Sequence, residues 1–238
     1  MTPSAELDIQ PPITLEQLIG KDQDLPSLPE IYLRVSEQLE DESTTVKKIG
    51  DTVQNDPAIT TRILKMVNSA YYGMPNEVAS VSQAVSLLGR ERLKHILIGS
   101  VLRGVFSEQE NPAFSMQVFW QHSIKTAIIA RQLATQINSI QEPESMFTAG
   151  LLHDIGKLLL IKKIPDRMLA AEDYMIQKRV DVLSAELSQV GVTHTAVGEA
   201  LMDHWGLPQL LIECARNHHE VVHDGPNREA THLIYLAN

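Results

Sequence analysis

Apolar residues recur every three or four positions along most of the chain, which is the spacing that gives a helix one buried face. No segment alternates apolar and polar residues with period two for long enough to predict a sheet. The pattern therefore predicts an all-α protein. The clearest apolar faces of the first half, expected to pack on each other and on the second half, are Ile59, Ile63, Val67; Val85, Leu88; Ile96 and Leu97.

Residues that favour helix ends lie beside several of these faces. The stretch Ser27-Leu-Pro-Glu30 has the pattern of a capping box, with a proline in the first turn. Asp56 and Ser80 each precede an apolar face, so their side chains are expected to accept hydrogen bonds from the first free N–H groups. Gly89 is expected to end the helix that Ser80 begins. Further helices are predicted at about 116–137, 166–179, 181–190, 193–204 and 208–218.

The distribution of polar segments predicts one domain with two parts. Residues 1–23 are expected to be an N-terminal tail, and 24–238 the domain. Within it, 24–106 forms an N-terminal helical subdomain and 112–238 a second helical core, separated by the polar stretch SEQENPAF at 107–114. The final residues, THLIYLAN, contain no glycine and no capping residue. The chain is therefore expected to be truncated inside a helix at its C-terminal end.

Charge and composition exclude several classes of function. A net charge of −10 over 238 residues disfavours a DNA-binding protein, which needs a basic face. The single cysteine, Cys214, excludes a disulfide framework and is expected to be buried and inert. No apolar run approaches the ~20 residues of a membrane span, and the N-terminus lacks the basic and apolar regions of a secretory signal. These features predict a cytoplasmic protein without a membrane partner.

The stretch GLLHDIGKLLL, residues 150–160, places His153 and Asp154 inside an apolar run. A buried carboxylate without a partner costs several kcal/mol, so this pair needs a metal ion, or each other and the backbone. Lys157 lies four residues after His153 and, on one continuous helix, would share its face. It is the one remaining group here that could contact a phosphate, and its alternative role is a helix-end lysine in solvent.

Six side chains are candidates for a common site. Each lies next to small or apolar residues, and imidazole and carboxylate groups are the usual nitrogen and oxygen ligands of zinc, iron, manganese and nickel. Four other histidines, His95, His204, His223 and His232, are expected to be hydrogen-bonded at helix ends. The six metal-ligand candidates are His122, His153, Asp154, His194, His218 and His219.

Several longer motifs resemble those of a known family. LPSLPEIYLRV, QNDPAITTRILKMVNSAYYG and SVSQAVSLLGRERLKHI in the first half resemble the HDOD domain, the "HD-related output domain" of bacterial signalling proteins. FWQHS, AGLLHDIGKLLL and HWGLPQLLIECARNHH in the second half do so too, and His122 with His153-Asp154 resembles the signature of the HD phosphohydrolase superfamily. The resemblance runs from about residue 24 to the end. It implies an N-terminal bundle packed on an HD-type helical core, signalling protein partners, and a regulatory role without established catalysis.

Two departures from the superfamily pattern bear on catalysis. The cyclic-dinucleotide phosphodiesterases of the superfamily carry Asp-Gly-x-Gly-Tyr-Pro after His-His-Glu, whereas here Pro226 follows Asp224-Gly225 directly. Asn238 aligns with the aspartate that closes the metal site, and a neutral amide is a weaker ligand than a carboxylate. Both departures predict a degenerate site with partial or no occupancy by a divalent metal. They therefore predict a non-catalytic signalling module.

Two alternatives remain open. One is a metal-dependent phosphohydrolase or cyclic-dinucleotide phosphodiesterase, which requires that two metal ions can be assembled. The other is a regulator that binds a nucleotide or cyclic dinucleotide without cleaving it, with Lys157 as the contact to phosphate.

Overall fold

The structure, a computed structural model, describes residues 11–19, 25–70, 72–106, 114–137, 140, 143–221 and 224–238. Every regular element within these ranges is a helix, so the all-α prediction is confirmed. None of the described helices is long and apolar enough to cross a membrane.

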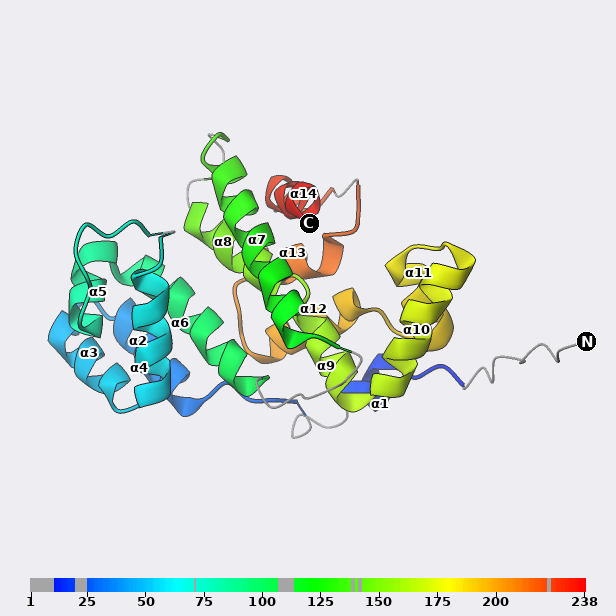
Figure 1. Ribbon diagram of the computed structural model, residues 1–238, viewed down its shortest axis with the longest axis horizontal. Coiled ribbons are helices and arrows are strands. Elements are labelled where there is room, and N and C mark those ends of the chain that lie inside the picture. The colour runs from blue at the N-terminus through cyan, green and yellow to red at the C-terminus, as the bar shows by residue number, and fades with distance from the viewer. Residues whose placement is uncertain are drawn as a thin grey trace, which may run out of the picture.

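The first half of the chain forms a bundle of helices at one end of the molecule (Figure 1). Asp56 accepts a hydrogen bond from the N–H of Ile59 at 3.0 Å, and Ser80 one from Gln83 at 3.1 Å, as predicted. The predicted capping box is wrong. The helix begins at Glu30, so its N-cap position falls on Pro29, and no side chain makes a capping hydrogen bond there. The bundle comprises α2 (Glu30–Glu40), α3 (Val46–Gln54), α4 (Pro57–Val67), α5 (Val81–Leu88) and α6 (Arg90–Val105).

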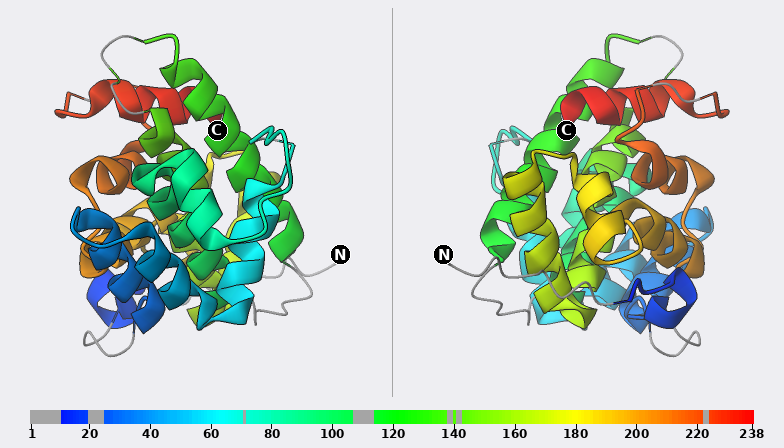
Figure 2. Two further views of the ribbon diagram at one scale, coloured as in Figure 1. Left: turned by 90° about the vertical axis from the view of Figure 1, so that its left-hand side faces the viewer. Right: turned by 90° about the vertical axis from the view of Figure 1, so that its right-hand side faces the viewer.

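In the second half, the long helix α7 packs on α8 and α14 near the middle of the molecule (Figures 1 and 2). Helices α10 and α11 form a hairpin at the end opposite the N-terminal bundle. The helices are α7 (Met116–Ala134), α8 (Pro143–Leu152), α9 (Ile155–Lys163), α10 (Pro165–Lys178), α11 (Val182–Gln189), α12 (His194–His204), α13 (Gln209–Asn217) and α14 (Arg228–Ala237).

One hydrophobic core joins the two halves. Helix α6 packs on α2, α4 and α5 of the bundle and also on α8 of the second half. The apolar faces expected from the sequence all lie in this shared core, with exposures between 0 and 8%. The predicted boundary at 107–114 lies outside the described residues except for Phe114.

Part of the predicted N-terminal tail packs against the second half. Residues 11–19 contain α1 (Leu15–Ile19), whose Leu18 side chain is buried. The N–H of Ile13 donates to the carbonyl of Val190 at 2.8 Å, and Lys163 donates to the carbonyl of Leu18 at 2.7 Å. This segment therefore ties together the ends of α9 and α11. The rest of 1–23 lies outside the described residues.

Cys214 is expected to resist thiol reagents in the folded protein. Its side chain is fully buried, and burial raises the pKa of its thiol to about 12. Since the thiolate is the reactive form, modification near pH 8 should be slower than that of an exposed thiol by about a thousandfold or more. Absorbance with a disulfide reagent checks this, and the urea-unfolded chain serves as the fully reactive control. Rapid stoichiometric reaction without urea would contradict the burial of this helix face.

Candidate metal centre

His153 and Asp154 lie in a break between two helices. Helix α8 ends at Leu152 and α9 begins at Ile155, so the single helix assumed from the sequence is wrong. As a result Lys157 does not align with His153. It lies one turn after Asp154, and its ammonium group donates to Asp154 Oδ2 at 2.7 Å.

Glycines on both sides of the break allow close helix packing. A Cβ atom at Gly150 would lie 2.6 Å from the Cα of Ala127 in α7, and one at Gly156 would lie 2.0 Å from the carbonyl oxygen of His194 in α12. Both approaches are possible only without a side chain. The break is therefore held against the two helices that carry His122 and His194.

The structure brings all six candidate residues together. His122 comes from α7, His194 is the first residue of α12, and His218 and His219 follow α13. Their ligand atoms fall into two groups that share Asp154, each group lying within 4.8 Å. The two groups are Asp154, His194, His218 and His219, and His122, His153 and Asp154.

The four-donor group has the spacing of ligands around one ion. Asp154 Oδ1 lies 3.2 Å from His194 Nε2 and 3.3 Å from His218 Nε2. His194 Nε2 lies 3.2 Å from the Nε2 atoms of both His218 and His219. Two ligands that each bind a metal at about 2.1 Å lie about 3.0–3.4 Å apart at angles of 90–110°. The arrangement therefore fits a single first-row metal ion.

The three-donor group uses the other oxygen of the same carboxylate. His122 Nε2 lies 3.2 Å from His153 Nε2, and Asp154 Oδ2 lies 3.4 Å from His153 Nε2 and 3.7 Å from His122 Nε2. Asp154 thus presents one oxygen to each group and could bridge two ions. The side chain of Asn238 forms a hydrogen bond with His122 at the edge of this group.

Backbone carbonyls orient two of the imidazole rings. His153 Nδ1 lies 2.7 Å from the carbonyl of Gly150, and His218 Nδ1 lies 2.8 Å from that of Ala215. A carbonyl oxygen only accepts hydrogen bonds, so each Nδ1 carries the proton and each Nε2 of the neutral ring presents a lone pair. Such outer partners are typical of metal-binding histidines.

Glu186 performs the same task for the third ring. Its side chain is almost fully buried, both carboxylate oxygens lie 2.8 Å from His194 Nδ1, and one accepts from the His194 backbone N–H at 2.7 Å. Burial lowers the pKa of His194, but the carboxylates of Asp154 and Glu186 outweigh it, so the pKa lies above its ordinary value. Glu186 could not be identified from the sequence, because an acidic residue on an amphipathic helix usually faces solvent.

The centre is rich in acceptors. Asp154 Oδ1 is buried and makes no hydrogen bond with any described residue, which is costly for a carboxylate oxygen. The Nε2 atoms of His194 and His218 lie 3.2 and 3.3 Å from this oxygen. The Nδ1 atoms of His153, His194 and His218 are bound by backbone carbonyls and Glu186, whereas Asp154 Oδ1 has no such partner. A divalent cation fits this donor set, and nitrogen and oxygen ligands without thiolate suit iron, manganese, nickel or zinc.

The electrostatics keep three of these ligands, His218, His219 and Asp154, ready for a cation at neutral pH. Burial lowers the pKa of His218 to about 3 and that of His219 to about 4, so neither ring needs to lose a proton. Burial alone would raise the pKa of Asp154, but His153 and the ammonium of Lys157 outweigh it, and the pKa lies well below its ordinary value. The carboxylate is therefore ionised.

One edge of the centre is open. His153, Asp154, His194 and His218 are buried, whereas the side chain of His122 is 38% exposed and that of Lys157 25% exposed. A solvent molecule or ligand would reach the centre from this edge.

The remaining histidines lie outside the centre. His95 forms a hydrogen bond with Thr148, His232 with the carbonyl of Val221, and His204 is the last residue of α12. His223 lies outside the described residues.

Solved structures of bacterial proteins share the fold. A protein from Shewanella amazonensis SB2B, provisionally named a phosphohydrolase, is 25% identical with a TM-score of 0.78, covering 92% of this chain and 78% of its own. A provisionally named signal transduction protein from Marinobacter aquaeolei VT8 is 25% identical with a TM-score of 0.70, covering 97% and 51%. An HDOD domain protein with unknown function from Geobacter sulfurreducens, 24% identical, has a TM-score of 0.76, covering 90% and 71%.

A curated relative and a family model match by sequence. An uncharacterized protein of Treponema pallidum (strain Nichols) is 27% identical over 206 residues, which are 84% of this chain but only 38% of the relative's length. The HDOD domain model matches residues 25–221, which contain every candidate ligand. Because this match covers most of the sequence, the chain belongs to the HDOD domain family.

Proposed function

We propose that this chain is a regulatory module of a bacterial signalling system that binds a divalent metal ion and does not turn over phosphodiesters. The observation that carries this proposal is that the two donor groups differ in their number of ligands. Four buried or half-buried ligands surround the first position, whereas the second has three ligands and a neutral amide at its edge.

This difference predicts one firmly bound ion and a weak second one. At the first position, outer hydrogen bonds hold the rings of His194 and His218 in place. At the second, His122 is partly exposed, and its hydrogen bond with the neutral amide of Asn238 brings no negative charge. When bound, divalent ions polarise phosphate oxygens, and hydrolases of the two-metal type need both positions filled. The weak second position therefore favours sensing over hydrolysis.

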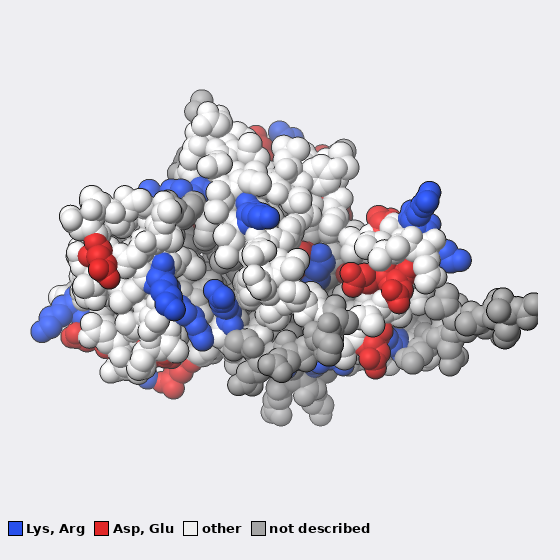
Figure 3. Space-filling model, viewed as in Figure 1, with Lys and Arg blue, Asp and Glu red and all other residues white. Residues whose placement is uncertain are grey.

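The proposed partners are signalling proteins rather than DNA or a membrane, and the proposed location is the cytoplasm. The net charge is −10, and on the face in Figure 3 the lysines and arginines are scattered rather than gathered in one patch. A phosphate-backbone binder gathers such residues on one surface.

A second candidate function is hydrolysis of a nucleotide or cyclic dinucleotide. Two adjacent donor groups sharing Asp154 favour it, and so does Lys157 beside the open edge, where its ammonium could contact a phosphate. The Shewanella protein's provisional name points the same way. A regulator that binds such a ligand without cleaving it would use the same lysine.

An activity assay distinguishes the two candidates. We expect no hydrolysis of cyclic dinucleotides, nucleoside triphosphates or nucleoside monophosphates above the rate without protein, with manganese, iron or nickel supplied. Product is measured by chromatography, and bound metal by elemental analysis of the same samples. Metal-dependent turnover that disappears in Asp154→Ala, but not in a variant of the exposed Asp173, would establish the hydrolase instead. Absence of bound metal in the wild type would refute the metal-binding part.

A further inference from the structure

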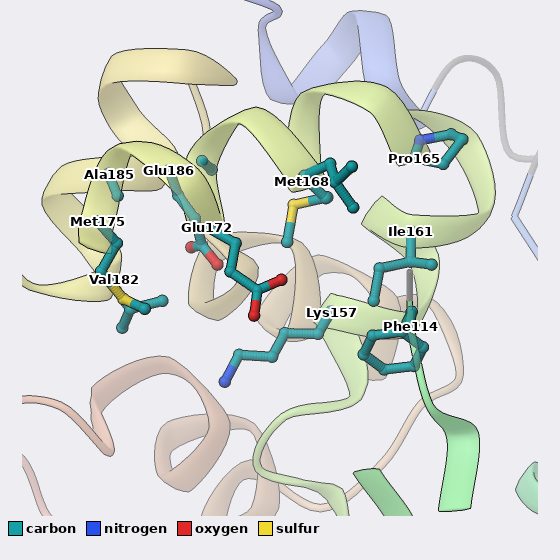
Figure 4. Close-up of a pocket in the computed structure, with 12 residues that line it drawn as sticks. Phe114, Lys157, Ile161, Pro165, Met168, Glu172, Met175, Val182, Ala185 and Glu186 are labelled. Carbon is teal, nitrogen blue, oxygen red and sulfur yellow. The ribbon is translucent and has the colours of Figure 1, made fainter. Parts of the chain in front are cut away.

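A cavity of about 240 Å³ lies between α9, α10 and α11, beside the metal centre (Figure 4). Helix α10 forms an outer wall of the cavity, since Ala171 is the only residue of this helix that is buried. This volume is below the roughly 300–1,000 Å³ of pockets for drug-sized ligands, so an apolar cavity with a few polar groups suits a smaller molecule here. The apolar lining consists mainly of Phe114, Ile161, Met168, Leu169, Met175 and Val182.

Two residues belong both to the cavity wall and to the metal centre. Lys157 lines the cavity, and its ammonium group donates to Asp154 Oδ2 at 2.7 Å. Glu186 lines it too, and its carboxylate holds the ring of His194. The inner end of the cavity is therefore continuous with the groups that hold and orient the metal ligands.

The charged groups differ between the inner end and the mouth of the cavity. The carboxylate of Glu186 is already engaged by two N–H groups of His194, so it offers little to a ligand. Glu172 lines the cavity from an exposed position and would repel an anion near the mouth. The inner end carries the ammonium of Lys157, and a divalent ion would add positive charge there. An anionic group is therefore favoured at the inner end.

We propose that this cavity binds a small amphipathic molecule with a compact apolar or aromatic body and an oxyanion head, either carboxylate or phosphate. The body lies among the apolar side chains, and the head lies at Lys157 beside the metal ion. The inference rests on the proposed metal-binding function, because Lys157 alone is partly neutralised by Asp154. It gives the regulatory module a ligand whose binding depends on the metal.

Pairs of probes with the same head test the cavity. Phenylphosphonate is compared with methylphosphonate, and benzoate with acetate, by calorimetric titration of the full manganese-loaded chain. We expect the aromatic member of at least one pair to bind tenfold or more tightly than its small partner, because burial of a ring removes apolar surface from water. The pair that shows the preference identifies the head as phosphate-like or carboxylate. Equal affinities within both pairs would overturn the proposal.

Two variants of α10 test whether the preference for the aromatic probe arises in this cavity. Leu169 lines the cavity and is 41% exposed, so Leu169→Asp places a charge in the cavity without burying it. Ile176 is 65% exposed and does not line the cavity, so Ile176→Asp is the matched control. We expect Leu169→Asp to remove the aromatic preference and Ile176→Asp to retain it, with unchanged metal content in both.

The outcomes separate the two proposals. Full metal content in the wild type without an aromatic preference would refute the ligand cavity and leave the metal-binding function standing. A preference that survives in Leu169→Asp would place the aromatic body elsewhere and refute the cavity as its site. Absence of bound metal would refute both.

Discussion

Replacement of Asp154 by alanine is expected to reduce the affinity for a divalent metal by more than about a hundredfold, because changes to outer partners already cost 10–100-fold. Asp154 places one oxygen in each donor group, so this single change removes a ligand from both positions. It also removes the only carboxylate among the candidate ligands, and the remaining donors are imidazoles beside the Lys157 ammonium. Elemental analysis of the purified variant and titration with manganese or nickel measure the effect.

The matched control is Asp173→Ala, which removes an exposed carboxylate from α10. This variant should bind metal as the wild type does, and circular dichroism should show that both variants keep their helices. Wild-type metal content in Asp154→Ala would mean that the ion is held elsewhere, and the centre would then have no part in metal binding.

Features that depend on neighbouring residues could be predicted from the sequence. The side chain of Asp56 caps α4 because its partner, the N–H of Ile59, is three residues away, and Ser80 caps α5 in the same way. The buried faces of α4, α5 and α6 follow from helical spacing alone. These effects are local, so the order of residues determines them.

Features that depend on distant contacts could not be predicted in this way. The break between α8 and α9 depends on packing of Gly150 and Gly156 against α7 and α12, which no local pattern reports. The N-terminal segment is ordered because Ile13 pairs with Val190, far along the chain. Glycine at 191, with φ of +99°, leaves room for this segment, since a Cβ there would lie 2.6 Å from Pro12.

In the candidate site too, some features could be predicted from the sequence and others depend on distant contacts. The types of its donors and their apolar neighbours are visible in the sequence, and they identified the six residues that the structure brings together. Glu186 was not visible, because its burial depends on the N–H groups of His194 turning toward it across the loop between α11 and α12. The metal-ligand roles and the phosphate contact of Lys157 stay predictions until metal and ligand binding are measured.

Packing around Gly156 gives a prediction about stability. Here α9 crosses α12 so closely that a Cβ would lie 2.0 Å from the carbonyl oxygen of His194 and 2.6 Å from the backbone nitrogen of Gly198. Both contacts are with backbone, which cannot move aside as a side chain can. Gly156→Ala is therefore expected to lower the free energy of unfolding by about 3 kcal/mol or more, at or above the upper end of usual overpacking costs. Urea unfolding followed by circular dichroism measures the change.

Gly99→Ala in α6 is the matched control. There the added Cβ would meet only the end of the Leu151 side chain, at 2.6 Å, and that side chain can change rotamer. Because alanine favours a helix over glycine by about 1 kcal/mol, the control should lie within about 1 kcal/mol of the wild type. Relief of the clash at Gly156 requires α12 to move away from α9, which carries His194 away from Asp154. The folded fraction of Gly156→Ala should therefore also bind metal more weakly, whereas equal stability and metal affinity in the two variants would show that the crossing does not position the centre.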